Sequence, residues 1–186
     1  MIGCKPLEIE LTAKGVPAAR FVTDAGAVFK DKDRIEIEPS ATGVVLRTIW
    51  DFEMECAVAE LREALGFEIE HGPPEILYRK ESRLLEPIMR VRVMVPEDSI
   101  GEVIGDLNRR RAKVQELKGG GDCYCRIECL VPLANIFGYF YIMQQLAGGQ
   151  GKVEVDFHGY DHVPPIVPDP DPSTPAAAAL SNRKAG

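Results

Sequence analysis

Three consecutive arginines, Arg109, Arg110 and Arg111, stand in the stretch IGDLNRRRAKV of an acidic chain. Neighbouring guanidinium groups repel one another, so each one needs a helix terminus, a carboxylate or an anionic partner. Cations in the last turn of a helix complement its macrodipole by about 0.3 to 1 kcal/mol. Asp106 and Glu102 also lie within helical reach. These partners account for one or two of the arginines.

The third arginine, with Lys113 just beyond it, favours a small phosphate-facing edge. Successive helical residues fan out by about 100°, so three neighbours cannot all reach one carboxylate and at least one should face solvent. The 186-residue chain has a formal net charge of -7, which argues against indiscriminate nucleic-acid binding and against DNA as a partner. A basic patch on an acidic body is better suited to a shaped RNA site.

No residue pattern indicates catalysis. The three histidines are scattered over strand ends and a loop, without a nucleophile beside them: His71, His158 and His162. Gly151-Lys152 is followed by Val153 rather than by Ser or Thr, so it does not form a phosphate-binding loop. We therefore expect no enzymatic activity, no cofactor and no GTP binding by this chain alone.

Cys123, Cys125 and Cys129 are spaced at odd intervals along a predicted strand. This spacing places all three on one face, where we expect small core hydrophobes. The neighbouring sequence offers no fourth ligand for a tetrahedral metal site, so we expect no metal.

Hydrophobic periodicity predicts strand, helix, strand, strand, helix, strand twice along the chain. In the first half the expected elements are strand 7–11, a helix from Pro17 to Phe29, a hairpin of strands 34–38 and 44–50, a helix after a capping Asp51 that ends at Gly66, and strand 67–71. In the second half they are strand 88–95, a helix from Pro96 to Leu107, strand 112–117, a glycine turn, strand 123–131, a helix over 133–146 and strand 152–158. The pattern predicts an α+β chain of two tandem ferredoxin-like (split βαβ) domains, with helices on one face of each antiparallel sheet.

The same elements divide the chain into residues 1–80 and 86–163, joined by a short junction at 81–85. From Pro164 to Gly186 the sequence is rich in proline and alanine, without periodicity, which predicts a disordered tail. No apolar run approaches the roughly 18 residues of a membrane span, and the N-terminus lacks a secretory pattern. With its odd count of five cysteines, the protein is expected to be cytoplasmic.

Residues 84–164 resemble the C-terminal fifth domain of the translational GTPase elongation factor G. The residues that carry the resemblance are Glu86-Pro87-Ile88-Met89, Gly105-Asp106-Leu107-Asn108-Arg109-Arg110 and Phe137-Gly138-Tyr139. Upstream, DFEMECAVAELREALGFEIEHGPPEILYRKE is similar to the end of that factor's third domain. Relative to the family, the GTPase, second and fourth domains are missing, and RKESR stands where the fourth domain would be inserted.

The resemblance implies a noncatalytic protein of translation that binds ribosomal RNA near the GTPase-associated centre, or a separate translational GTPase. The RNA-binding candidates are Asn108, Arg109, Arg110, Arg111, Lys113, Phe137, Gly138 and Tyr139. Gln144 and Gln150 stand where the family commonly has arginines, and Ala112 replaces a common glycine. These losses keep a second hypothesis open, in which a stand-alone ferredoxin-like module binds proteins or a ligand without the ribosome.

Overall fold

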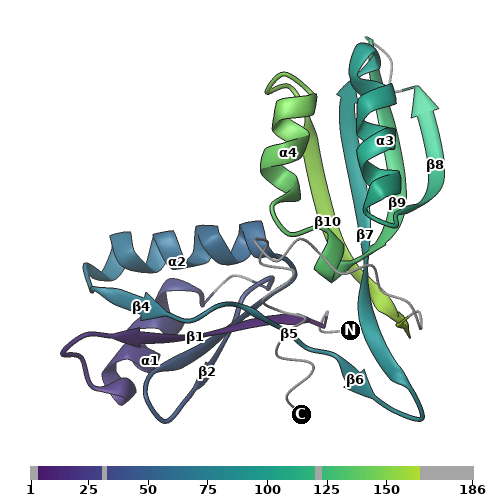
Figure 1. Ribbon diagram of the computed structural model, residues 1–186. Coiled ribbons are helices and arrows are strands. Elements are labelled where there is room, and N and C mark those ends of the chain that lie inside the picture. The colour runs from purple at the N-terminus through teal and green to yellow at the C-terminus, as the bar shows by residue number, and fades with distance from the viewer. Residues whose placement is uncertain (1–3, 31–32, 120–122, 164–186) are drawn as a thin grey trace. The chain divides into compact units, whose positions relative to one another are not determined.

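The structure, a computed structural model, describes residues 4–30, 33–119 and 123–163. The chain forms two compact units, and the division falls between Leu77 and Tyr78 (Figure 1). Each unit contains an antiparallel sheet and α-helices in the order expected from the sequence. The prediction of two tandem ferredoxin-like domains is confirmed.

The first unit is built around strand β1. Its elements are β1 (Leu7–Ala13), α1 (Ala18–Val28), β2 (Glu36–Pro39), β3 (Val44–Thr48), α2 (Asp51–Leu65), β4 (Ile69–His71) and β5 (Glu75–Ile76). The sheet order is β2-β3-β1-β4, and the short β5 also pairs with β1. Alternation along β1 buries Leu7, Ile9 and Leu11 against the helices, while glutamates occupy the other face.

Helix α2 differs from expectation at its start and agrees at its end. Asp51 is the first helical residue and Trp50 occupies the cap position, so the expected capping role of Asp51 is wrong. Asp51 still lies in the first turn, where its charge complements the helix dipole. Gly66 ends the helix in the left-handed conformation, with φ of 63°, which glycine adopts without a steric penalty.

The second unit repeats the topology with longer strands. Its elements are β6 (Arg79–Lys80), β7 (Leu84–Pro96), a 3₁₀ turn η1 (Glu97–Ser99), α3 (Ile100–Arg109), β8 (Lys113–Gly119), β9 (Tyr124–Pro132), a 3₁₀ turn η2 (Leu133–Asn135), α4 (Tyr139–Leu146) and β10 (Lys152–His162). The sheet order is β10-β7-β9-β8, with β6 beside β7. Figure 1 shows α3 and α4 side by side on one face of this sheet, and the two helices contact each other.

The side chains of strand β7 alternate between the two faces of the second sheet. Met89, Val91 and Val93 are fully buried beneath the helices. Arg90 and Arg92 lie on the opposite, open face, where they pair with carboxylates of β9 and β10. The period-two alternation therefore places apolar side chains in the core and charged side chains on the opposite face of the sheet.

The expected boundary and junction differ from the structure. Arg79 and Lys80 pair with Leu85 and Leu84, so they belong to the second sheet rather than to the first unit. The amide of Glu81 donates to the carbonyl of Arg83 within the connecting turn. Most of the expected junction at 81–85 is therefore a hairpin of the second unit.

Two expected helices of the second unit are shorter than the sequence indicates. Strand β7 continues through Pro96, and η1 precedes α3. The expected helix over 133–146 is interrupted, because Gly138 takes a φ of 69° and α4 begins only after it. The glycine turn falls largely, and the tail at 164–186 entirely, outside the described residues. Within the described ranges, no helix is long and apolar enough to cross a membrane.

Candidate nucleic-acid interface

The three arginines lie where α3 ends and the chain turns into β8. Val103 and Leu107 form the buried stripe of the helix. The amide of Ala112 donates to the Leu107 carbonyl at 3.0 Å, and that of Arg111 donates to the Asn108 carbonyl at 3.1 Å. These two bonds form a Schellman motif, which satisfies the last carbonyls of the helix.

Arg111 occupies the left-handed position of this motif, with φ of 63°. A side chain at such a position costs about 1 kcal/mol or more relative to glycine. Because of this turn the three arginine side chains point in different directions, and each one has different neighbours.

Arg109 is the solvent-facing arginine. Its side chain is 76% exposed, and its Nη2 lies 3.7 Å from Oδ1 of Asp106, one turn earlier. An exposed pair of this kind contributes between about 0 and 1 kcal/mol. The prediction that at least one arginine faces solvent is confirmed, and Arg109 is available to an external anion.

Arg110 joins three elements of the second unit. Its Nε donates to Asp106 at 2.6 Å, and its Nη1 donates to the carbonyl of Asn135 in η2 at 2.9 Å. Its guanidinium carbon lies 5.1 Å from the centroid of the Tyr139 ring, in cation–π contact. With a side chain only 20% exposed, Arg110 holds α3 against η2 and α4.

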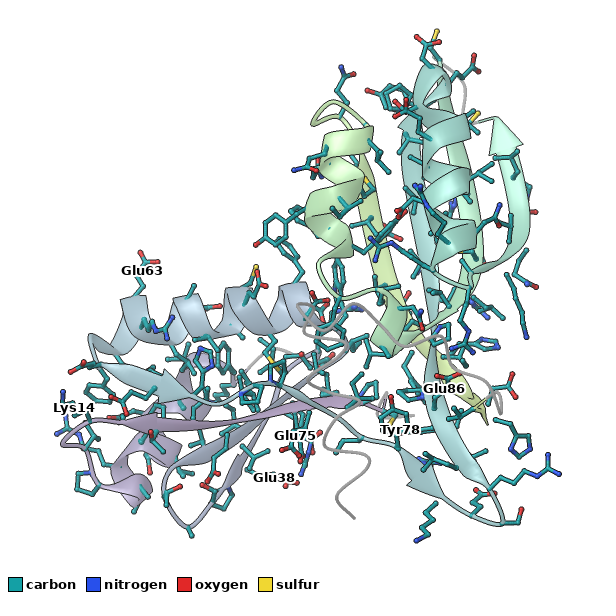
Figure 2. All side chains as sticks on the ribbon, viewed as in Figure 1. Lys14, Glu38, Glu63, Glu75, Tyr78 and Glu86 are labelled. Atoms are coloured by element: carbon teal, nitrogen blue, oxygen red, sulfur yellow. The ribbon has the colours of Figure 1, made fainter. Side chains whose placement is uncertain are left out.

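Arg111 turns back toward the sheet. Its Nη2 donates to Oε1 of Glu86 at 3.0 Å, and the Glu86 side chain is only 6% exposed. Glu86, labelled in Figure 2, lies on β7. This pair ties the end of α3 to strand β7, so the structure gives Arg111 a structural role in place of the expected phosphate-facing one.

Asn108 and Lys113 flank the arginines and are exposed. Asn108 lies in the last turn of α3, and Lys113 begins the edge strand β8. We call Asn108, Arg109 and Lys113 the α3-end surface. Of the eight RNA-binding candidates, these three have the exposure that contact with an RNA would require.

The segment Phe137-Gly138-Tyr139 places its two aromatic side chains in the core. Phe137 and Tyr139 are buried, and Gly138 provides the left-handed residue before α4. The pKa of the Tyr139 hydroxyl is raised, mainly by burial and to a smaller extent by the neighbouring Cys129. The tertiary fold places both aromatic side chains in the core, which disfavours their contact with RNA, whereas Gly138 is half-buried and its contact with RNA stays a prediction.

The cysteine prediction holds for two of three residues. Cys125 and Cys129 are buried, and burial raises the pKa of Cys129 to about 12. Cys123 is exposed and precedes β9 with φ of 64°, so its assignment to the core is wrong. Among the described residues, no group of three or more His, Cys, Asp or Glu side chains could hold a metal ion.

Sequence reasoning anticipated Asp106 as a partner but missed Glu86 and the carbonyl of Asn135. Asp106 could be predicted as a partner because it lies three residues before Arg109 and four residues before Arg110 on the same helix. Glu86 is 25 residues away from Arg111, as Asn135 is from Arg110. No local spacing signals such contacts.

Comparison with known proteins gives a family match for the second part of the chain. Residues 83–170 match the family model described as elongation factor G C-terminus. The resemblance of the second unit to elongation factor G is confirmed. An elongation factor G from Jannaschia sp. (strain CCS1) is 39% identical over 107 residues, which are 56% of this chain and 15% of that protein.

A crystal structure of a protein from Thermus thermophilus shares the fold, with a TM-score of 0.63. The two are 16% identical, and the match covers 96% of this chain and 43% of that one. The chain thus spans about a seventh of the curated elongation factor G and less than half of the solved structure. The similarity of the first unit to the third domain of elongation factor G stays a prediction.

Proposed function

We propose that this protein is a noncatalytic, elongation factor G-related protein of translation, whose second unit binds ribosomal RNA through the α3-end surface. Homology to the C-terminal domain of elongation factor G supports a role in translation. The observation that carries the RNA-binding proposal is the exposed guanidinium of Arg109, beside exposed Asn108 and Lys113.

The arrangement around Asp106 allows Arg109 to change partners at low cost. Asp106 keeps its shorter contact with Arg110 when Arg109 moves away, so its carboxylate stays paired. A phosphate oxygen can then replace the carboxylate as the acceptor for Arg109. Such contacts release counterions from the RNA, so the affinity should fall as the salt concentration rises.

In this proposal the protein acts in the cytoplasm and leaves GTP hydrolysis to a separate factor. A translational GTPase encoded elsewhere is the alternative partner for the same surface. Neither role requires this chain to bind GTP by itself.

A second candidate function is protein association without ribosome binding. The observation that favours it is a cavity of about 500 Å³ in the first unit. Four glutamates line this cavity: Glu8, Glu10, Glu70 and Glu75. Together with the net charge of -7, this lining favours a basic partner over a nucleic acid.

Co-sedimentation with bacterial ribosomes at low and at moderate salt separates the two candidates. RNA binding predicts saturable co-sedimentation that weakens steeply with salt. The same protein centrifuged without ribosomes serves as the carry-over control. Absence of the protein from the ribosomal pellet at low salt would reject the proposal and leave protein association as the better account.

A further inference from the structure

Strand β8 forms one edge of the second sheet. Within the residues that the structure describes, it pairs with β9 on one side only, and Figure 1 shows it as an outer strand beside α3. All seven of its residues are exposed. Such an edge presents a row of backbone N–H and C=O groups to which another strand can pair.

The helix-bearing face of this edge carries apolar side chains. Leu117 pairs with Ile127 and Val114 pairs with Cys129, and both partners on β9 are fully buried. Directly opposed side chains lie on the same face of a sheet, so Leu117 and Val114 point to the side of the core. Leu117 is nevertheless 51% exposed. An exposed apolar edge favours pairing with a second chain.

The opposite face of the edge carries charges of both signs. Glu116 and Lys118 stand on either side of Leu117, and Oε1 of Glu116 lies 2.6 Å from Nζ of Lys118. Lysines on an edge strand discourage pairing with an arbitrary strand. A partner strand must therefore place a negative charge opposite Lys118 and a positive charge opposite Glu116.

A second copy of β8 meets this requirement when Leu117 lies on the two-fold axis. Symmetric antiparallel strands keep directly opposed side chains on one face, so one residue must lie opposite its own copy. An axis at Glu116 or at Lys118 would oppose like charges. An axis at Leu117 opposes the two leucines and pairs Glu116 of each copy with Lys118 of the other.

We propose that the chain forms a homodimer in which residues 115–119 of β8 pair antiparallel with the same residues of a second copy. The two second-unit sheets then form one continuous sheet, and every contact occurs twice by symmetry. Such a short ladder buries a small area, so we expect a dissociation constant of about 10 to 500 µM. The ladder does not include the α3-end surface, so this inference goes beyond the proposed function and does not depend on it.

Sedimentation velocity of the full chain is the direct test. Between about 5 µM and 1 mM protein, the sedimentation coefficient should rise from the monomer value toward the dimer value. Amide hydrogen exchange in residues 115–119 should slow over the same range, because dimerisation pairs their free backbone groups. A monomer at all concentrations, or a dimer with unchanged exchange in these residues, would overturn the inference.

Two charge reversals, Glu116→Lys and Lys118→Glu, test the register. Each one replaces two opposite-charge pairs with two like-charge pairs, so the dissociation constant of each variant alone should rise at least about fourfold. An equimolar mixture of the two variants should dimerise about as tightly as the unmodified protein, because each lysine then lies opposite a glutamate. Both positions are exposed, so we expect the variants to keep the fold, which circular dichroism checks.

Lys14→Glu in the first unit is the matched control for Lys118→Glu. The side chain of Lys14 is 66% exposed, against 65% for Lys118, and each lysine pairs with a glutamate. The control changes the net charge equally and should leave the dissociation constant unchanged. Equal weakening by both substitutions would show an effect of net charge alone and overturn the inference. A mixture of Glu116→Lys and Lys118→Glu that dimerises no better than either variant alone would overturn it as well.

Discussion

Arg110→Gln is expected to destabilise the second unit, whereas Arg109→Gln is not. Arg110 loses a contact with Asp106 at 2.6 Å and another with the Asn135 carbonyl at 2.9 Å. Hydrogen bonds that involve a charged group contribute about 1.5 to 3 kcal/mol each, and glutamine can retain part of one. The cation–π contact with Tyr139 adds about 0.5 to 1 kcal/mol.

The expected loss in the free energy of unfolding is about 2 to 4 kcal/mol, after allowance for the remaining solvent exposure of Arg110. For Arg109→Gln the corresponding loss is below about 0.5 kcal/mol, because its single 3.7 Å pair is exposed. The two substitutions remove the same charge from neighbouring positions, so each is the control for the other.

Hydrogen exchange followed by mass spectrometry measures this difference within the second unit. If exchange of α3 and α4 proceeds through unfolding of the unit, Arg110→Gln should accelerate it about 30- to 700-fold, which is 2 to 4 kcal/mol converted at 1.4 kcal/mol per factor of ten. Urea unfolding followed by circular dichroism gives an independent value. Equal exchange rates in the two variants would refute the view that Arg110 holds α3 to η2 and α4.

Three further predictions follow from burial and close contacts. Tyr139→Phe should stabilise the protein by about 1 kcal/mol in thermal unfolding, because the Tyr139 hydroxyl is buried without a hydrogen-bond partner among the described residues; a loss of stability would show that the hydroxyl is satisfied. Gly43→Ala should destabilise the first unit by at least about 2 kcal/mol in urea unfolding, because a Cβ would lie 2.0 Å from the Leu11 carbonyl oxygen; unchanged stability would contradict that close approach. Iodoacetamide at about pH 8 should modify exposed Cys123 and spare Cys129, whose pKa is raised to about 12 by burial; equal labelling in peptide mass spectrometry would contradict the assigned burial.

The strands of the second sheet could be predicted because their signal is local. Met89, Val91 and Val93 alternate with arginines. A run of this length with a period of two indicates a β-strand with one buried face. The two-residue strands β5 and β6 have no such period, so they and the position of the domain boundary could not be read from the sequence.

The functional surface was predictable only in part. Helical geometry requires that three adjacent arginines diverge, but it does not say which one faces solvent. That choice depends on the left-handed turn at Arg111 and on contacts with Glu86 and Asn135, which are distant in sequence.

The most direct test of the central claim compares the salt dependence of ribosome binding for the unmodified protein, Arg109→Gln and Arg20→Gln. Arg20 is a matched control in the first unit, because its side chain is 67% exposed and pairs with Asp24 at 3.4 Å. If Arg109 contacts a phosphate, Arg109→Gln should weaken binding and lower the slope of log affinity against log salt by about one, while Arg20→Gln leaves both unchanged. Identical affinities and slopes for all three proteins would contradict the assignment of Arg109 to the RNA.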